Sequence, residues 1–248
     1  SRPGGTIKFF VSSHAQSNFS ASLYRSISAD PNPAGIGVVE ESASRYFKTQ
    51  TFKSRIQKIN SGSYAETEKP LKINAFSQFK VTISFFSTLQ SNAPQTVFSW
   101  GDLSMFIDQN SCVAIDLGED QLLISSEKIR PRLWYSCELS ISDPGGVSLQ
   151  LTAKNTETVV RNKGKEIERK SLLALFKRSA LARIGSADKE CGRFFNGKIE
   201  APTVFVDGDV VAEWDFSRDI PSFTIKTAKG PNLKLFNAPT RGVTGKDW

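Results

Sequence analysis

The chain has 248 residues, and its 32 basic and 25 acidic residues give a net charge of +7 with its one histidine neutral. With 39% hydrophobic and 23% charged residues, it has the composition of an ordinary folded domain, which excludes collagen-like, low-complexity and disordered chains. No apolar run approaches the roughly 20 residues that cross a bilayer, and the start lacks the pattern of a secretory signal, so we expect no membrane partner.

The front of the chain differs from the rest. Alternating apolar residues from Ile7 to Val11 predict a strand, and residues 29–37 read ADPNPAGIG, a rigid turn-rich connector. This part is too short and too polar to fold alone, so we expect its strands to pair with a sheet of the main domain or of a neighbour. The sequence therefore predicts N-terminal strands and a connector over residues 1–65, followed by one β-sandwich over residues 66–248.

Alternation of apolar and polar residues with period two dominates the second part and marks half-buried strands. The tetrapeptide DPGG at residues 143–146 and the pair Asp207–Gly208 separate such runs and predict hairpin turns, because proline fixes φ and glycine accepts positive φ. Many short strands with turns between them predict an all-β sandwich or jelly roll. The expected strands are Phe79–Phe85, Thr96–Trp100, Ser104–Ile107, Cys112–Asp116, Gln121–Ser125, Trp134–Ser142, Val147–Leu151, Val204–Val206 and Val211–Phe216.

One stretch breaks the alternation. Apolar residues from Leu172 to Ala180 recur at helical spacing, which predicts one short helix over residues 166–183. The densest basic stretch, residues 163–183, overlaps it and has no aromatic residues at stacking intervals. Because surfaces that bind nucleic acids combine a basic groove with such aromatics, we expect a solvated or docking face and no nucleic-acid partner.

The cysteines indicate a reducing environment. Cys112, Cys137 and Cys191 are odd in number and far apart, so they form a poor disulfide framework. None belongs to a C-x-x-C pair, and the one histidine is His14, so the residue types of a zinc site are lacking. We expect buried reduced thiols and a cytoplasmic location.

Few residues are candidates for chemistry. His14 lies in a polar loop, and the sequence contains neither a nucleophile elbow nor a phosphate-binding loop. No catalytic residue is therefore predicted. Glu213 and Asp215 lie two apart on an expected strand and would share a face, as the paired carboxylates of a glycoside hydrolase require. Ser217 and Arg218 follow where a glucanase pattern has a further glutamate, so we favour a solvated or docking face.

The clusters of acidic residues give little indication of a metal site. The acidic groups Asp116, Glu119 and Asp120, and Asp207 and Asp209, lack the spacing of a recognised calcium loop, so no metal site is predicted.

Aromatic side chains are the remaining candidates for binding. Tyr24, Tyr46 and Tyr64 could serve a sugar site, whereas Trp100 follows an apolar run and is expected in the core. Trp248 is expected to pack on a neighbouring domain, and Arg241 before it to pair with an acidic partner surface.

Two stretches resemble a known fold. Residues 132–139, RLWYSCEL, with the return strand VSLQLTA, and residues 182–200, ARIGSADKECGRFFNGKIE, are similar to the laminin-G-like, concanavalin A-type jelly roll. The resemblance implies a tight bend at Gly197 where no Cβ fits, with Phe195 and Ile199 pointing into the sandwich. The end of the chain resembles the strands that usually begin such a domain, so we infer a permuted strand order.

Three further strings point to one family. They are RPGGTIKFF at residues 2–10, ADPNPAGIGVVEE at residues 29–41, and the segment 214–248, which contains WDFSRDIPS and NAPTRGVTG. They resemble the front region of the N,N-dimethylformamidase large subunit, although KTAKGPNLKLFNAP lacks the expected SGNG turn. In that family a jelly-roll module precedes a glutamine-amidotransferase-like domain with the catalytic iron. The resemblance implies that the iron ligands lie in this downstream domain and that the present chain holds no cofactor.

The expected function is therefore a non-catalytic β-sandwich module of a dimethylformamidase-like enzyme, contacting the downstream catalytic domain or other subunits. The residues expected at that contact are Arg241, Trp248, Glu213 and Asp215. Two alternatives remain open: a lectin-like module that binds carbohydrate, and a stand-alone hydrolase that uses Glu213 and Asp215.

Overall fold

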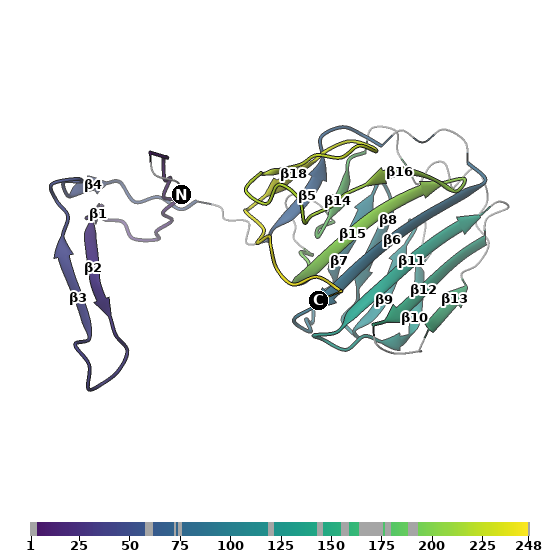
Figure 1. Ribbon diagram of the computed structural model, residues 1–248, viewed down its shortest axis with the longest axis horizontal. Helices are drawn as coiled ribbons and strands as arrows, with labels where there is room; N and C mark the ends of the chain where they lie inside the picture. The colour runs from purple at the N-terminus through teal and green to yellow at the C-terminus, as the bar shows by residue number, and fades with distance from the viewer. Residues whose placement is uncertain are drawn as a thin grey trace. The chain divides into compact units, whose positions relative to one another are not determined.

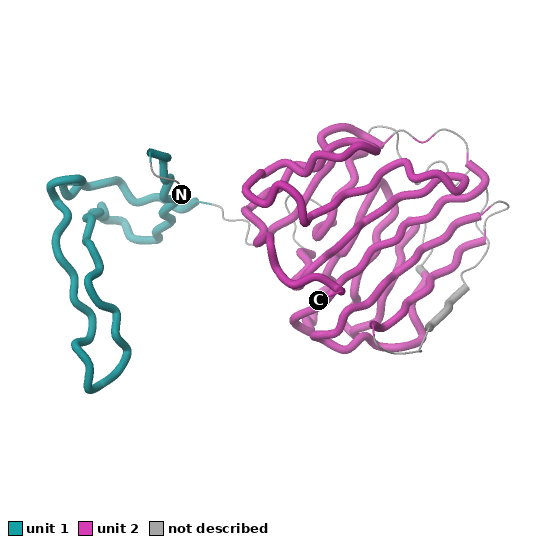
Figure 2. The backbone as a smooth tube through the Cα atoms, in the orientation of Figure 1, with its two compact units in different colours: residues 1–59 teal, residues 60–248 magenta. Residues whose placement is uncertain are grey.

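The computed structural model describes residues 4–57, 62–71, 73, 76–118, 122–142, 146–154, 159–163, 176, 180–187 and 193–247. The chain divides into two compact units, Ser1–Ile59 and Asn60–Trp248 (Figure 2). Its described elements are all β-strands (Figure 1). These residues therefore include no helix that is long and apolar enough to cross a membrane.

Two antiparallel sheets make up the second unit. The strands of the larger sheet are β5 (Tyr64–Thr67), β7 (Gln95–Trp100), β8 (Leu103–Ile107), β9 (Cys112–Asp116), β10 (Leu122–Lys128), β14 (Ala182–Ile184), β17 (Thr224–Ile225) and β18 (Leu233–Phe236). Their order is β10-β9-β8-β7-β14-β5-β18-β17. The strands of the smaller sheet are β6 (Gln78–Ser87), β11 (Trp134–Ser142), β12 (Gly146–Ala153), β13 (Val159–Lys163), β15 (Gly197–Val206) and β16 (Asp209–Glu213). Their order is β13-β12-β11-β6-β15-β16.

The alternation read from the sequence produces the core. Along β6, Phe79, Val81, Ile83 and Phe85 are buried, and β11 places Leu139 opposite Val81 in register. The buried side chains of both sheets form one apolar cluster, so the sheets pack face to face as a sandwich. The expected all-β, concanavalin A-like jelly roll is confirmed.

The two ends of the second unit meet in the larger sheet. β18 pairs antiparallel with β5, with Leu235 opposite Ala65, and the rings of Phe236 and Tyr64 stack with centroids 4.7 Å apart. Figure 1 shows the yellow β18 beside the blue β5. The first strand of the unit is therefore a neighbour of its last strand, which is the relationship that a permuted strand order requires.

The predicted helix needs a correction. Most of residues 166–183 lies outside the described residues, but the last two, Ala182 and Arg183, belong to β14 between β5 and β7. Ala182 and Ile184 are buried while Arg183 between them is not. Burial therefore alternates along residues 182–184 as it does in a β-strand, and not with the spacing of a helix.

The first unit contains two small sheets. β1 (Phe19–Ala21) pairs with β4 (Gln50–Phe52), and β2 (Tyr24–Ala29) pairs with β3 (Val38–Ser42). The strands of this unit thus pair with one another. The strand expected at residues 7–11 is not formed, and Phe9 and Phe10 are 83% and 81% exposed, so the alternation there has no sheet to face. None of the described residues of this unit is buried.

Candidate functional site

The residues expected at a contact lie just after β16. The predicted Asp207–Gly208 turn joins β15 to β16, and β16 ends at Glu213, earlier than the sequence indicated. Trp214 then turns inward: its side chain is fully buried and its indole N–H donates to the Pro231 carbonyl at 2.8 Å. Asp215 lies beyond the end of β16, but the alternation continues: Ala212 and Trp214 are buried, whereas Glu213 and Asp215 are both exposed, as a solvated or docking face requires.

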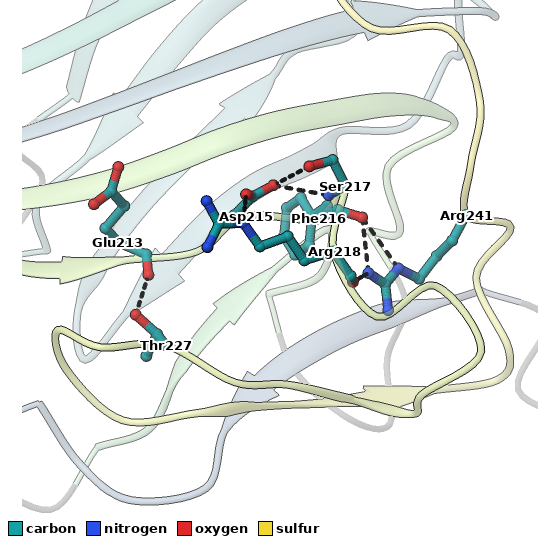
Figure 3. Close-up of polar contacts among 7 residues, drawn as sticks. All are labelled: Glu213, Asp215, Phe216, Ser217, Arg218, Thr227 and Arg241. Atoms are coloured by element: carbon teal, nitrogen blue, oxygen red, sulfur yellow. Dashed lines mark hydrogen bonds and ion pairs between the residues drawn. The ribbon is translucent and has the colours of Figure 1, made fainter.

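Asp215 organises the turn that follows. Its Oδ1 accepts hydrogen bonds from the Ser217 hydroxyl at 2.6 Å and the Ser217 backbone N–H at 2.9 Å, and its Oδ2 lies 2.8 Å from Nε of Arg218 (Figure 3). The hydrogen bond from the Ser217 hydroxyl, followed by that from its N–H, lowers the pKa of Asp215. A general acid at neutral pH needs a raised pKa, so this carboxylate is suited to holding the turn.

Glu213 is held by its backbone. Its carbonyl accepts the Thr227 hydroxyl at 2.5 Å, and its N–H donates to the Lys229 carbonyl at 3.2 Å. The side chain is exposed and stands apart from the Asp215 carboxylate (Figure 3).

Arg241 binds the loop after Asp215 from the other side. Its Nη2 and Nε lie 2.7 and 3.3 Å from the Phe216 carbonyl, and Nη1 donates to the carbonyls of Asp219 and Ser222, both at 3.2 Å. Nη2 also donates to the carbonyl of Arg218. The guanidinium therefore fixes the loop by hydrogen bonds to four carbonyls. Trp248, the remaining residue expected at the contact, lies outside the described residues.

Apolar side chains surround this loop, and the sequence analysis missed them. Ile220, Phe223 and Val243 are 46%, 65% and 49% exposed, and Gly242 lies against Ile220. We call these three side chains the Arg241 loop surface. They lie outside the strands, so no alternating pattern marks them as exposed, and the sequence offered no signal that separates them from the buried apolar residues of β17 and β18.

The other candidates have structural roles. Oδ1 of Asp207 accepts the backbone N–H groups of Ser77 and Gln78, each at 2.7 Å, and Asp116 accepts the N–H of Gly118 at 2.9 Å. Glu119 and Asp120 fall outside the described residues. Within the described part of the chain, no three His, Cys, Asp or Glu side chains gather as a metal ion requires.

The aromatic candidates for a sugar site separate into two groups. Tyr64 and Trp100 are buried in the sandwich, as expected for Trp100, whereas Tyr24 and Tyr46 are exposed in the first unit. His14 is also exposed there. The candidates therefore do not converge on one described site.

The comparisons with known proteins are consistent with this architecture. No family model matches the chain. The N,N-dimethylformamidase beta subunits of Alcaligenes sp and Paracoccus aminophilus are each 27% identical to it, in alignments that span 301 and 303 positions with gaps included. Each alignment covers 99% of this chain and 39% of the relative, so the chain spans well under half the length of the curated relatives it matches.

Among solved structures, a provisionally assigned carbohydrate-binding protein from Bacteroides ovatus superimposes with a TM-score of 0.50 at 14% identity. The match covers 83% of this chain and 68% of that protein. At this identity the likeness supports the sandwich fold and no more. By sequence, then, the chain is similar over nearly its whole length to N,N-dimethylformamidase beta subunits, in a region that makes up 39% of their length.

Proposed function

We propose that this chain is a non-catalytic β-sandwich module of a dimethylformamidase-like amide hydrolase, and that it contacts the parts of the enzyme that carry out the reaction. One observation carries the proposal: nearly the whole chain aligns with beta subunits of that enzyme, yet it accounts for 39% of their length. On this proposal, the iron implied by the family resemblance is held by other polypeptide, and the assembly works in the cytoplasm.

The geometry after β16 supports a contact role. Asp215 and Arg241 direct their hydrogen bonds to the local turn, which makes the loop a defined surface. The Arg241 loop surface is apolar and exposed, which is typical of a protein contact. We therefore propose that it faces the rest of the enzyme.

The activity test compares two preparations. The purified chain, and the assembly recovered from its source cells through a tag on this chain, are each supplied with N,N-dimethylformamide, and release of dimethylamine and formate is measured. We expect turnover by the assembly only. Turnover by the isolated chain that Glu213→Gln abolishes would support the stand-alone hydrolase instead. Specific binding on a glycan array, lost when Tyr46 is changed to Ala, would support the lectin alternative.

The contact test uses two matched variants. Phe223→Asp places a charge in the Arg241 loop surface, and Leu89→Asp places the same charge at another exposed apolar residue of the second unit. We expect Phe223→Asp to lower recovery of the assembly and Leu89→Asp to leave it unchanged, with both isolated chains keeping their thermal midpoints. Equal recovery of both variants would argue against this surface.

A further inference from the structure

The first unit carries most of the exposed apolar side chains. In the described part of the chain, 18 large hydrophobic side chains are exposed, and 13 of them lie in residues 1–59. The same residues contribute nothing to the buried core. They are Ile7, Phe9, Phe10, Val11, Leu23, Tyr24, Ile27, Ile36, Val38, Val39, Tyr46, Phe52 and Ile56.

Their setting makes this unit incomplete without a covering surface. Its described sheets, β1-β4 and β2-β3, have two strands each, so every strand keeps one edge without a strand partner. Two-stranded sheets are marginally stable in water, and open edges and apolar side chains are stabilised when another surface covers them. A unit of this kind gains its stability by docking.

The net charge of the first unit indicates what kind of surface could cover it. Eight of the 32 basic residues but three of the 25 acidic residues lie in residues 1–59, a net charge of +5, whereas the 24 basic and 22 acidic residues of the second unit give +2. The described basic residues of the first unit are all exposed. Most adjoin an aromatic residue, as in Lys8–Phe9 and Phe52–Lys53, and the guanidinium of Arg45 lies 4.6 Å from the centre of the Tyr46 ring.

We infer that residues 4–57 dock onto an acidic, partly apolar surface of a different protein chain in the assembly. The inference deepens the proposed function and rests on it for the existence of that assembly. A second copy fits poorly, because both of its units are basic and like charges disfavour the contact. The basic residues beside aromatic rings would suit nucleic acid too, but eight of the 13 exposed side chains are aliphatic and give the bases of a single strand nothing to stack on.

The test identifies what covers the unit. The native assembly is treated with a carbodiimide, which couples a lysine amine to a carboxylate in direct contact, and the products are mapped by mass spectrometry. We expect Lys8, Lys48 and Lys53 to be coupled to Asp or Glu of a different polypeptide. Hydrogen exchange within residues 4–57 should be slower in the assembly than in the isolated chain.

Two sets of variants distinguish the effect of the positive charge of these lysines from their ability to form cross-links. Changing Lys8, Lys48 and Lys53 to Arg keeps the charge, so the assembly should persist while the cross-links disappear. Changing the same three residues to Glu should weaken association on the order of tenfold or more. The matched control changes three exposed basic residues of the second unit that lie away from the Arg241 loop surface, Lys69, Lys128 and Arg130, to Glu, and should leave association unchanged.

Other outcomes overturn the inference. Cross-links from these lysines only to a second copy or to the same chain, recovery that nuclease abolishes, or no cross-links at all would each do so. The proposed function is judged separately by amide hydrolysis. An assembly that hydrolyses the amide but leaves residues 4–57 uncovered refutes the docking alone, whereas a covered unit in an inactive assembly refutes the function.

Discussion

Arg241 closes onto the backbone of Phe216, 25 residues earlier in the chain, with Nη2 at 2.7 Å and Nε at 3.3 Å from one carbonyl oxygen. One planar cation therefore holds the segment after β18 against the loop after β16. The Arg241 loop surface owes its form to this contact, because Ile220 and Phe223 lie in or directly beside the loop whose carbonyls the guanidinium binds.

Arg241→Lys should loosen this loop. A lysine ammonium has three donors and no planar fork, so it cannot satisfy the same four carbonyls. We expect a loss of about 1–3 kcal/mol in the free energy of unfolding and faster hydrogen exchange in residues 216–222. Arg218→Lys, at a largely exposed side chain, is the control and should change the free energy of unfolding by less than about 0.5 kcal/mol. Equal effects of the two variants would contradict the role of Arg241.

Ser217→Ala should raise the pKa of Asp215 toward its ordinary value. The Ser217 hydroxyl is the largest cause of the lowering, ahead of Arg218. A pKa lowered by folding contributes stability above the pKa of the unfolded state, and this contribution is lost as the pH falls through the folded pKa. The variant should therefore be less sensitive to acid in this range. A carboxyl titration followed by NMR checks this, and a larger shift in Arg218→Gln would contradict it.

Gly197→Ala should destabilise the sandwich. A Cβ at Gly197 would lie 2.1 Å from the carbonyl oxygen of Phe86, because β15 starts close against the backbone of β6. We expect a cost of about 1–3 kcal/mol, measured from the urea midpoint. Gly208→Asn is the comparison, since Gly208 has a φ of +88° but open space around it, and asparagine tolerates that conformation. A larger loss at Gly208 would show that close approach is not the constraint.

Cys137 should react with thiol reagents only after unfolding. Burial, followed by the charge of Glu138, raises the pKa of its thiol from 9.0 to about 12. In a Cys112→Ser, Cys191→Ser background, labelling at pH 8 should follow the unfolding rate. Because folding raises this pKa, its contribution to stability is complete below about pH 9 and declines as the pH rises toward 12. Rapid labelling of the folded chain would refute the buried, neutral thiol.

Alternation was a sufficient guide where one strand face is buried against the opposite sheet. β6 and β11 were predictable for this reason, since a slip of one residue would expose the whole apolar set. β14 was not, because three residues are too few to show a period and the apolar residues before it recur at helical spacing. Neither β5 nor β18 was among the expected strands. The resemblance to a known fold predicted only a permuted strand order, since alternation carries no information about which strands meet.

The site was predictable in its residues but not in its contacts. Asp215 and Arg241 were identified from the sequence, yet Arg241 binds backbone carbonyls, which every residue carries and no motif reveals. The apolar residues from Ile7 to Val11 illustrate the converse: the pattern of a strand is present, but β1 to β4 pair with one another and leave it exposed.

The joining of β5 to β18 also sets an order of events during translation. The Ser63 hydroxyl reaches the Asn237 carbonyl at 2.8 Å across 174 residues of chain. The nascent polypeptide therefore leaves the ribosome with β5 lacking one of its neighbours until β18 has emerged. Contacts so distant in sequence form slowly, and an unpaired edge invites aggregation in the interval. A ribosome stalled before residue 233 should accordingly hold an unclosed sandwich that chaperones retain.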